Sequence, residues 1–254
     1  MNYIISASTD IGYKKVNQDS LFVRRINSCI GEVVFAVLCD GMGGLQKGEI
    51  ASSSLTIAFT DWMYAYLPSL LTKTPDDSVI KSQWINVIAE QNDKLRIYSQ
   101  CDGLLMGSTI TMVLITENRY YMLNIGDTRA YEINSTIRQI SIDHTVASHE
   151  ANLGNMTEIQ AEQAPYKNVL TKCVGITDEV LPDMFFGEPQ KNTVYLLCSD
   201  GFRHKITDDE ILEKIQLNEI STEDDLKHRE EYLINLNKQR GETDNISVIT
   251  IAVL

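Results

Sequence analysis

VVFAVLCDGMGG, residues 33–44, joins an unbroken apolar run to an aspartate and a glycine-rich turn. A short run of this kind, rich in Val and closed by a turn signal, predicts a buried β-strand. The strand would end at Asp40, which places a carboxylate at the edge of a sheet. Functional groups gather on the loops at such edges, because a rigid scaffold positions them there. The stretch therefore predicts a sheet and marks one part of a candidate site.

Further segments are enriched in Val, Ile, Leu and Tyr in the same way, and each is bounded by Gly, Asp or Asn. They predict strands at 108–115, 120–125, 129–133, 193–198 and 246–253. The first two are separated by a short polar segment, 116–119, which favours an antiparallel hairpin.

Long segments with an apolar residue every three or four positions separate these runs, and they predict helices. The predicted helices are 47–67, 77–99, 208–215 and 223–236. We expect one strand to precede the first two helices and a run of strands to follow them. Because this order lacks regular β-α-β alternation, it favours an α+β fold with antiparallel sheet and helices on its faces.

The chain has 254 residues, 43% of them hydrophobic, and a formal net charge of −13. No repeat or linker divides it, so we expect a single domain over residues 1–254. The absence of a Lys/Arg block argues against nucleic acid as a partner. The longest apolar run is too short to span a bilayer, which argues against membrane anchoring. Five cysteines without a C-x-x-C pair fit a reducing cytoplasm.

Aspartates recur where the predicted strands end or begin. Asp40, Asp127 and Asp200 each follow one strand, and Asp244 precedes another. Taken singly, an Asp-Gly step is explained as a common turn. Four aspartates at the ends of buried strands are harder to explain in this way, because adjacent strand ends bring such groups together.

Carboxylates that converge raise one another's pKa unless a cation compensates their charge. Because no cysteine or histidine stands at ligand spacing, an all-oxygen site would select Mg²⁺ or Mn²⁺ over zinc or copper. Two ions sharing one aspartate could hold a bridging water whose lowered pKa makes it a nucleophile near neutral pH. The aspartates thus predict a hydrolytic metal site.

The motifs along the chain resemble those of the type 2C metal-dependent protein phosphatases, especially the short bacterial members. The similarity runs from Thr9 to the last predicted strand. Seven motifs carry it, in the family's order: Asn17-Gln18-Asp19, Asp40-Gly41-Met42-Gly43-Gly44, Gly107-Ser108-Thr109, Gly126-Asp127-Thr128-Arg129, Leu170-Thr171-Lys172, Cys198-Ser199-Asp200-Gly201 and Asp244-Asn245. One of these would be weak evidence, whereas seven in order are not explained by chance.

The resemblance implies an α-β-β-α sandwich of two antiparallel sheets flanked by helices, with a metal cleft at one end. It implies that Asp40 bridges two metal ions and that the Gly41 carbonyl is a further ligand of one of them. The polar segment 143–168 would correspond to the family's flap beside the cleft, a region suited to substrate choice.

The remaining metal residues are also implied by the resemblance. Asp200 and Asp244 would ligate the other ion, and Asp19 would hold metal-bound water. Asp127, together with Asp200, would form a weaker third site.

Two positions depart from the family's pattern. Lys14 stands where family members usually carry an arginine that grips the substrate phosphate, five residues before Asp19. Lysine offers a point charge in place of a bidentate fork. Met42 stands where many eukaryotic relatives have a histidine that can protonate the leaving oxygen. Bacterial relatives share this Met, and it leaves the general acid unassigned.

Three other conspicuous residues have simpler explanations than catalysis. We expect His144 to be a locally hydrogen-bonded loop histidine. Arg129 would pair with a carboxylate and fix the Asp127 loop. Cys198 lies inside an apolar run and would be a buried thiol.

The sequence thus predicts a hydrolase that removes phosphate from phosphoserine and phosphothreonine by direct attack of a metal-bridging water. Asp40, Lys14 and Asp19 are its candidate catalytic residues, Mn²⁺ or Mg²⁺ its cofactor, and phosphorylated proteins its substrates. A cognate serine/threonine kinase is an expectation from the resemblance. Two alternatives remain open: a catalytically silent relative that binds phosphoprotein, and a small-molecule phosphatase on the same fold.

Overall fold

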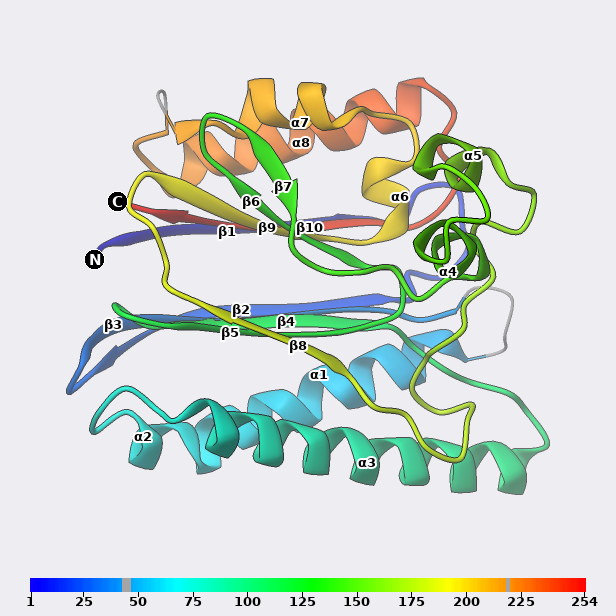
Figure 1. Cartoon of the computed structure of the whole chain (residues 1–254), viewed down its shortest axis with the longest axis horizontal. Coiled ribbons are helices and arrows are strands. Elements are labelled where there is room, and N and C mark those ends of the chain that lie inside the picture. The colour runs from blue at the N-terminus through cyan, green and yellow to red at the C-terminus, as the bar shows by residue number, and fades with distance from the viewer. Residues whose placement is uncertain (43–46, 218–219) are drawn as a thin grey trace.

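The computed structural model describes residues 1–42, 47–217 and 220–254, whose strands form two antiparallel five-stranded sheets. Sheet A has the order β1-β10-β9-β6-β7, with bounds Tyr3–Asp10, Ile246–Val253, Thr193–Cys198, Arg129–Ile133 and Ile137–Gln139. Sheet B has the order β2-β3-β4-β5-β8, with bounds Asp19–Ser28, Gly31–Asp40, Ile110–Ile115, Tyr120–Ile125 and Asp183–Gly187. The sheets lie face to face (Figure 1).

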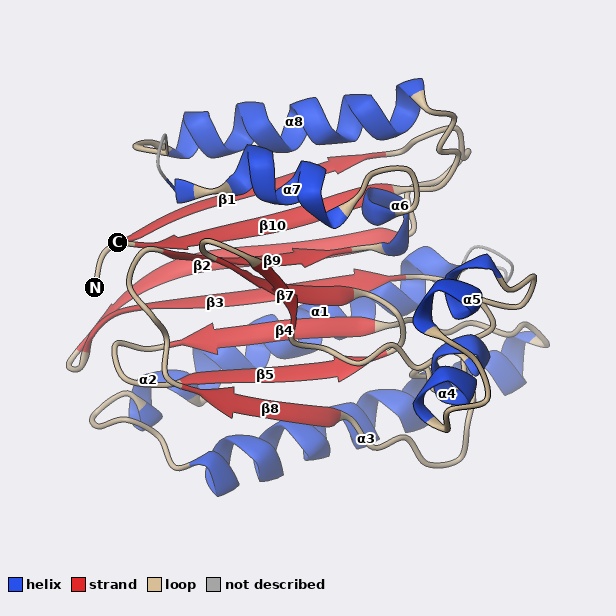
Figure 2. Cartoon of the chain, turned by 45° about the horizontal axis from the view of Figure 1, so that its top comes forward, coloured by secondary structure: helices blue, strands red, loops and turns tan. Residues whose placement is uncertain are grey.

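Helices cover the outer face of each sheet (Figures 1 and 2). Sheet B is covered by α1 (Gly48–Ala65), α2 (Leu67–Leu70) and α3 (Asp77–Asp102). Sheet A is covered by α7 (Asp208–Ile215) and α8 (Glu223–Gln239). The short helices α4 (Val146–Asn152), α5 (Glu158–Gln163) and α6 (Asp200–Arg203) lie at one end of the sandwich. The α-β-β-α arrangement expected from the resemblance is confirmed.

Strand β3 is apolar without interruption because it is buried on both faces. Phe35, Val37 and their alternate neighbours pack against α1 and α3, whereas Val34 and Leu38 face sheet A. Successive side chains of a strand point to opposite faces, so a strand in the middle of four layers requires apolar residues at every position. Full burial of each large side chain contributes about 1.5–3 kcal/mol.

Aromatic side chains fix the helical layer on sheet B. Trp62 of α1 and Trp84 of α3 meet edge to face with ring centroids 5.7 Å apart, and Phe35 of β3 lies 5.8 Å from Trp62. All three are buried. Edge-to-face pairs of this kind contribute about 0.5–1.5 kcal/mol beyond their burial.

Capping residues explain where the helices on sheet A begin. Thr207 and Thr222 each accept a hydrogen bond from the backbone N–H three residues on, and the side chain there returns a bond to the threonine N–H. These capping boxes satisfy backbone donors that the first turn leaves unpaired. The predicted starts of both helices are confirmed.

The expectation of a single strand before the first helix is wrong, because β1 and β2 precede β3. Both are edge strands, and β2 is largely half-buried or exposed, so neither carries an unbroken apolar run. The strands β7 and β8 and the one-turn helix α6 were likewise not predicted. The hairpin of β4 and β5 is confirmed. Among the described residues, no helix combines the length and apolar character needed to cross a membrane.

Candidate metal centre

The predicted aspartates lie at one end of the sandwich. Asp19 opens β2 directly opposite Asp40, which closes β3. Asp200 follows β9 and Asp244 precedes β10, and these two strands pair side by side. Asp127 lies between β5 of sheet B and β6, which pairs with β9. Antiparallel register therefore carries five aspartates from both sheets to the same end of the sandwich.

The charges of this cluster act on one another. The pKa of Asp40 is raised well above its ordinary value, first by burial and then by the negative charges of Asp19, Asp200, Asp127 and Asp244. Like charges at close range disfavour further ionisation. Asp40 thus lies at the electrostatic centre of the group, the position that the resemblance assigns to the bridging ligand.

The carboxylate oxygens of Asp19 are buried and poorly compensated. Neither Oδ1 nor Oδ2 makes a hydrogen bond of good geometry among the described residues, although the hydroxyls of Ser247 and Ser199 are close enough to lower the pKa of this carboxyl. Burial above all, and then the charges of Asp200 and Asp244, outweigh these hydroxyls and raise the pKa of Asp19 to about 7. Because an unsatisfied buried carboxylate is costly, these two oxygens suit a bound cation or its water shell.

Asp127 is 5% exposed, and its pKa is also raised to about 7, by burial first and then by the charge of Asp200. Arg203 partly offsets this, and its Nη2 donates to the Asp127 carbonyl oxygen at 3.2 Å. Asp127 is therefore close to Asp200, as a shared third site would require.

Gly41 is held where only a glycine fits. Its N–H donates to the Gln18 carbonyl oxygen at 3.0 Å, and a Cβ atom would come within 2.2 Å of the Gly48 carbonyl oxygen. The close approach of β3 to the start of α1 fixes the backbone that carries the candidate carbonyl ligand. Gly43 and Gly44 of the same motif lie outside the described residues.

The donors of this cluster are carboxylate oxygens, which suit a hard cation such as Mg²⁺ or Mn²⁺. Within residues 1–42, 47–217 and 220–254, no group of three or more Asp, Glu, His or Cys side chains is arranged so that it could hold a metal ion. A structural zinc site would need four close ligands.

Lys14 is at the edge of this cluster. Its Nζ lies 3.1 Å from Asp244 Oδ2, and both side chains are about 40% exposed. Asn245 holds the loop that carries Lys14, because its Nδ2 donates to the carbonyl oxygens of Ile11 and Val16. The structure therefore brings Lys14 beside a candidate metal ligand.

His144 is a hydrogen-bonded loop histidine, as predicted, but it is buried and its partners are distant in the sequence. Its Nδ1 accepts a hydrogen bond from the Gly126 N–H at 3.0 Å, and its Nε2 lies 3.1 Å from Asp183. Burial lowers the pKa of His144, which favours the neutral ring that this acceptor role requires. The ring fixes the glycine that precedes Asp127.

Arg129 and Cys198 also have the predicted roles. Arg129, which follows the Asp127 loop, makes a bidentate ion pair with Asp143, with contacts of 2.9–3.1 Å. Cys198 is fully buried, and burial raises the pKa of its thiol to about 12, which leaves it unreactive.

Three residues near the cluster were missed by the sequence analysis: Arg203, His204 and Glu242. His204 Nε2 lies 3.4 Å from Asp200 Oδ2, and His204 Nδ1 lies 3.3 Å from Glu242 Oε2. The i, i+4 spacing of Asp200 and His204 was the available signal. It went unused because α6 was not predicted.

The segment 143–168 contains α4 and α5 at the same end of the sandwich (Figure 1). Its action as a flap stays a prediction.

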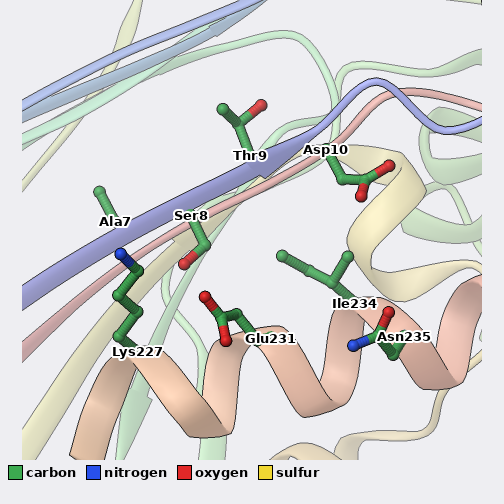
Figure 3. Close-up of a pocket in the computed structure, with 8 residues that line it drawn as sticks. All are labelled: Ala7, Ser8, Thr9, Asp10, Lys227, Glu231, Ile234 and Asn235. Atoms are coloured by element: carbon green, nitrogen blue, oxygen red, sulfur yellow. The ribbon is translucent and has the colours of Figure 1, made fainter. Parts of the chain in front are cut away.

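A separate cavity of about 430 Å³ lies between β1 and α8, lined by residues such as Ser8, Lys227 and Glu231 (Figure 3). None of the five clustered aspartates lines this cavity, so it is not the candidate metal centre.

Known proteins resemble the chain over nearly its full length. Residues 9–243 match the family profile described as "Protein phosphatase 2C". "Protein phosphatase PhpP" of Streptococcus pneumoniae is 28% identical over 252 residues, which cover 98% of this chain and 97% of that protein.

Solved structures agree with this assignment. Serine/threonine phosphatase Stp1 from Staphylococcus aureus has a TM-score of 0.82 and 28% identity, with 98% of this chain and 94% of that one covered. The catalytic domain of serine threonine protein phosphatase PstP, solved in complex with two manganese ions, has a TM-score of 0.78 and 25% identity, with both chains fully covered. The chain belongs to the protein phosphatase 2C family.

Proposed function

We propose that this protein is a metal-dependent serine/threonine phosphatase that hydrolyses phosphoserine and phosphothreonine in other proteins. The observation that carries the proposal is the convergence of five aspartates from both sheets, with the pKa of Asp40 raised by burial and by the charges of the other four. Membership of the protein phosphatase 2C family supports it, as do the names of the relatives PhpP and Stp1.

Each residue of the cluster has a proposed role. Asp40 would bind two ions, with the Gly41 carbonyl completing one site and Asp200 and Asp244 the other. Asp19 would orient bound water through its unpartnered oxygens. Divalent ions at these positions would lower the pKa of a bound water and offset the charge of the phosphate.

Lys14 would hold the phosphate of the substrate. In the structure its ammonium pairs with Asp244, which keeps it at the rim of the cluster. An ion bound by Asp244 would take over this carboxylate, so the ammonium would become available to a phosphate oxygen. The cleft thus provides negative charge for the metal and positive charge for the substrate.

Finer assignments follow from the same arrangement. Mn²⁺ or Mg²⁺ would be the ion, and Asp127 with Asp200 would hold a third, weaker one. The phosphoprotein substrates would come from a cognate serine/threonine kinase in a reducing compartment such as the cytoplasm. The five unpaired cysteines support that compartment.

Phosphate release from phosphothreonine, phosphoserine and phosphotyrosine peptides and from p-nitrophenyl phosphate tests the proposal, with and without metal. We expect hydrolysis of the first two peptides at millimolar Mn²⁺ or Mg²⁺ and its loss with chelator, because shared carboxylates with retained waters bind such ions loosely. Hydrolysis that survives prolonged chelation would contradict the mechanism. Activity on small phosphate esters alone would indicate a small-molecule phosphatase, and no activity would indicate a silent binding protein.

A further inference from the structure

His204 lies between two buried carboxylates. Its Nε2 faces Asp200 Oδ2 at 3.4 Å, and its Nδ1 faces Glu242 Oε2 at 3.3 Å. The side chains of Asp200, His204 and Glu242 are 15%, 13% and 6% exposed. Because the His204 side chain is enclosed, it is fixed in place. It therefore sets the position of each carboxylate relative to the other.

Glu242 in turn holds the backbone of the second metal-ligand candidate. Its Oε1 accepts hydrogen bonds from the N–H groups of Thr243 at 2.8 Å and Asp244 at 2.9 Å. The two contacts of His204, which are close approaches without hydrogen-bond geometry at its Nε2 and at Glu242 Oε2, and the hydrogen bonds of Glu242 therefore connect the Asp200 carboxylate to the Asp244 backbone.

The elements that carry these two aspartates have little rigidity of their own. Asp200 opens α6, a helix of four residues, and Asp244 lies in the loop that leads into β10. Asn237, at the end of α8, holds both elements from behind. It accepts from Lys205 N–H, donates to the Phe202 carbonyl oxygen, and accepts from Glu242 N–H through its own carbonyl.

From these contacts we infer that His204 and Glu242 are positioning residues, which set the separation of Asp200 and Asp244 and so determine how tightly the shared metal ion binds. The inference rests on the proposed function, because it concerns the same metal centre. Neither residue touches the substrate. Partners behind metal ligands commonly change metal affinity 10- to 100-fold when they are removed.

Isothermal titration of Mn²⁺ into the chelator-treated protein tests the inference, with His204→Ala, Glu242→Ala and the double variant. Each single change should weaken Mn²⁺ binding about 10- to 100-fold. Because the two residues act through one contact chain, the double variant should be no more than about twofold weaker than the worse single variant. His204→Gln, which keeps one N–H donor, should recover part of the affinity. His228→Ala, an exposed histidine on α8, is the matched control and should bind Mn²⁺ normally.

Kinetics separate positioning from a purely structural role. At saturating Mn²⁺, kcat for a phosphothreonine peptide should return to within about threefold of wild type, since only the metal affinity has changed. If Glu242→Ala does not fold, Glu242→Gln replaces it, because its amide oxygen can still accept from the backbone N–H groups.

The possible outcomes distinguish this inference from the function on which it rests. Unchanged Mn²⁺ affinity in folded variants, losses that multiply in the double variant, or a kcat that stays low at saturating metal would each overturn the positioning role. A wild-type protein that neither binds Mn²⁺ nor hydrolyses the peptide would overturn the proposed function itself.

Discussion

The Asp40 carboxylate destabilises the fold but has a central role in the proposed chemistry. Burial and four neighbouring aspartates raise its pKa, so its charge destabilises the metal-free fold. The same charge would hold the two ions. Functional sites often retain such unfavourable arrangements because the bound ligand compensates for them.

Asp40→Asn should therefore change activity and stability in opposite directions. We expect kcat to fall at least 100-fold, because the amide removes the charge that binds metal. The thermal midpoint of the metal-free protein should rise, by the equivalent of about 0.5–2 kcal/mol. Scanning calorimetry with and without Mn²⁺ measures this, and the Mn²⁺-dependent increase seen in wild type should disappear. Asp61→Asn on the exposed face of α1 is the control. A metal-free variant less stable than wild type would contradict this description of the cluster.

Lys14 gives a second test at a single position. A charged hydrogen bond to phosphate contributes roughly 1.5–3 kcal/mol, so Lys14→Ala should lower kcat/KM about tenfold to a few hundredfold. Lys14→Arg should keep or improve activity, because its fork can engage two phosphate oxygens. Steady-state kinetics on a phosphothreonine peptide measure both. If Lys15→Ala has the effect and Lys14→Ala does not, the alignment of this loop is off by one residue.

The loop of residues 11–16 depends on a glycine at its start. Gly12 has φ +61°, and a Cβ atom there would come within 2.0 Å of the Asp244 carbonyl oxygen. Gly12→Ala should therefore displace the loop from Asp244 and reduce both stability and kcat/KM. Gly154→Ala is a matched control, since Gly154 has φ +77° but has no atom within 4 Å of such a Cβ. Equal losses in the two variants, measured by melting and by peptide hydrolysis, would show that backbone strain alone is responsible.

Helix α8 is joined to β1 by a buried carboxylate. Glu230 is fully buried, and its Oε2 accepts from the hydroxyls of Ser6 and Ser8 at 2.7 Å each. Burial raises its pKa from 4.5 to about 7 in spite of these bonds, and the charge of Glu231 raises it slightly further. The neutral form is thus favoured in the fold, so the contribution of Glu230 to stability is present below pH 4.5 and is lost as the pH rises to about 7.

Glu230→Gln should remove this pH dependence. The difference in the free energy of unfolding, variant minus wild type, should increase by roughly 1 to 3 kcal/mol between pH 4.5 and pH 8. Urea unfolding at several pH values measures this difference. The contributions of the other carboxylates to the pH dependence cancel, because both proteins share them. A difference that is constant with pH would show that Glu230 titrates normally in the fold.

The sequence predicted the strands that lie in the middle of the molecule and missed those at its edges. β5, β9, β10 and residues 33–39 of β3 are buried on both faces and consist mostly of apolar residues, which are visible without any structure. β2 contains charged residues such as Arg24 and Arg25, because an edge strand can expose one face. α6 is too short to show helical periodicity.

The residues of the candidate site were likewise predicted only in part. Asp40, Asp127, Asp200 and Asp244 could be predicted because each follows or precedes a recognisable strand. The contact between His204 and Glu242 could not be predicted, since it joins the end of a one-turn helix to a loop about forty residues further along the chain. The pairing of β9 with β10, together with the hydrogen bonds of Asn237, brings these two segments together.

The central claim for the whole molecule is that strand ends from two sheets build one metal centre. Anomalous diffraction at the manganese edge, from crystals soaked in a Mn²⁺ concentration that supports hydrolysis, tests it most directly. We predict two peaks on either side of Asp40 at about 2.1 Å from its oxygens, one also near Asp200 and Asp244 and the other near the Gly41 carbonyl. An absence of anomalous density at the five aspartates, or density only at another place such as the cavity between β1 and α8, would contradict it.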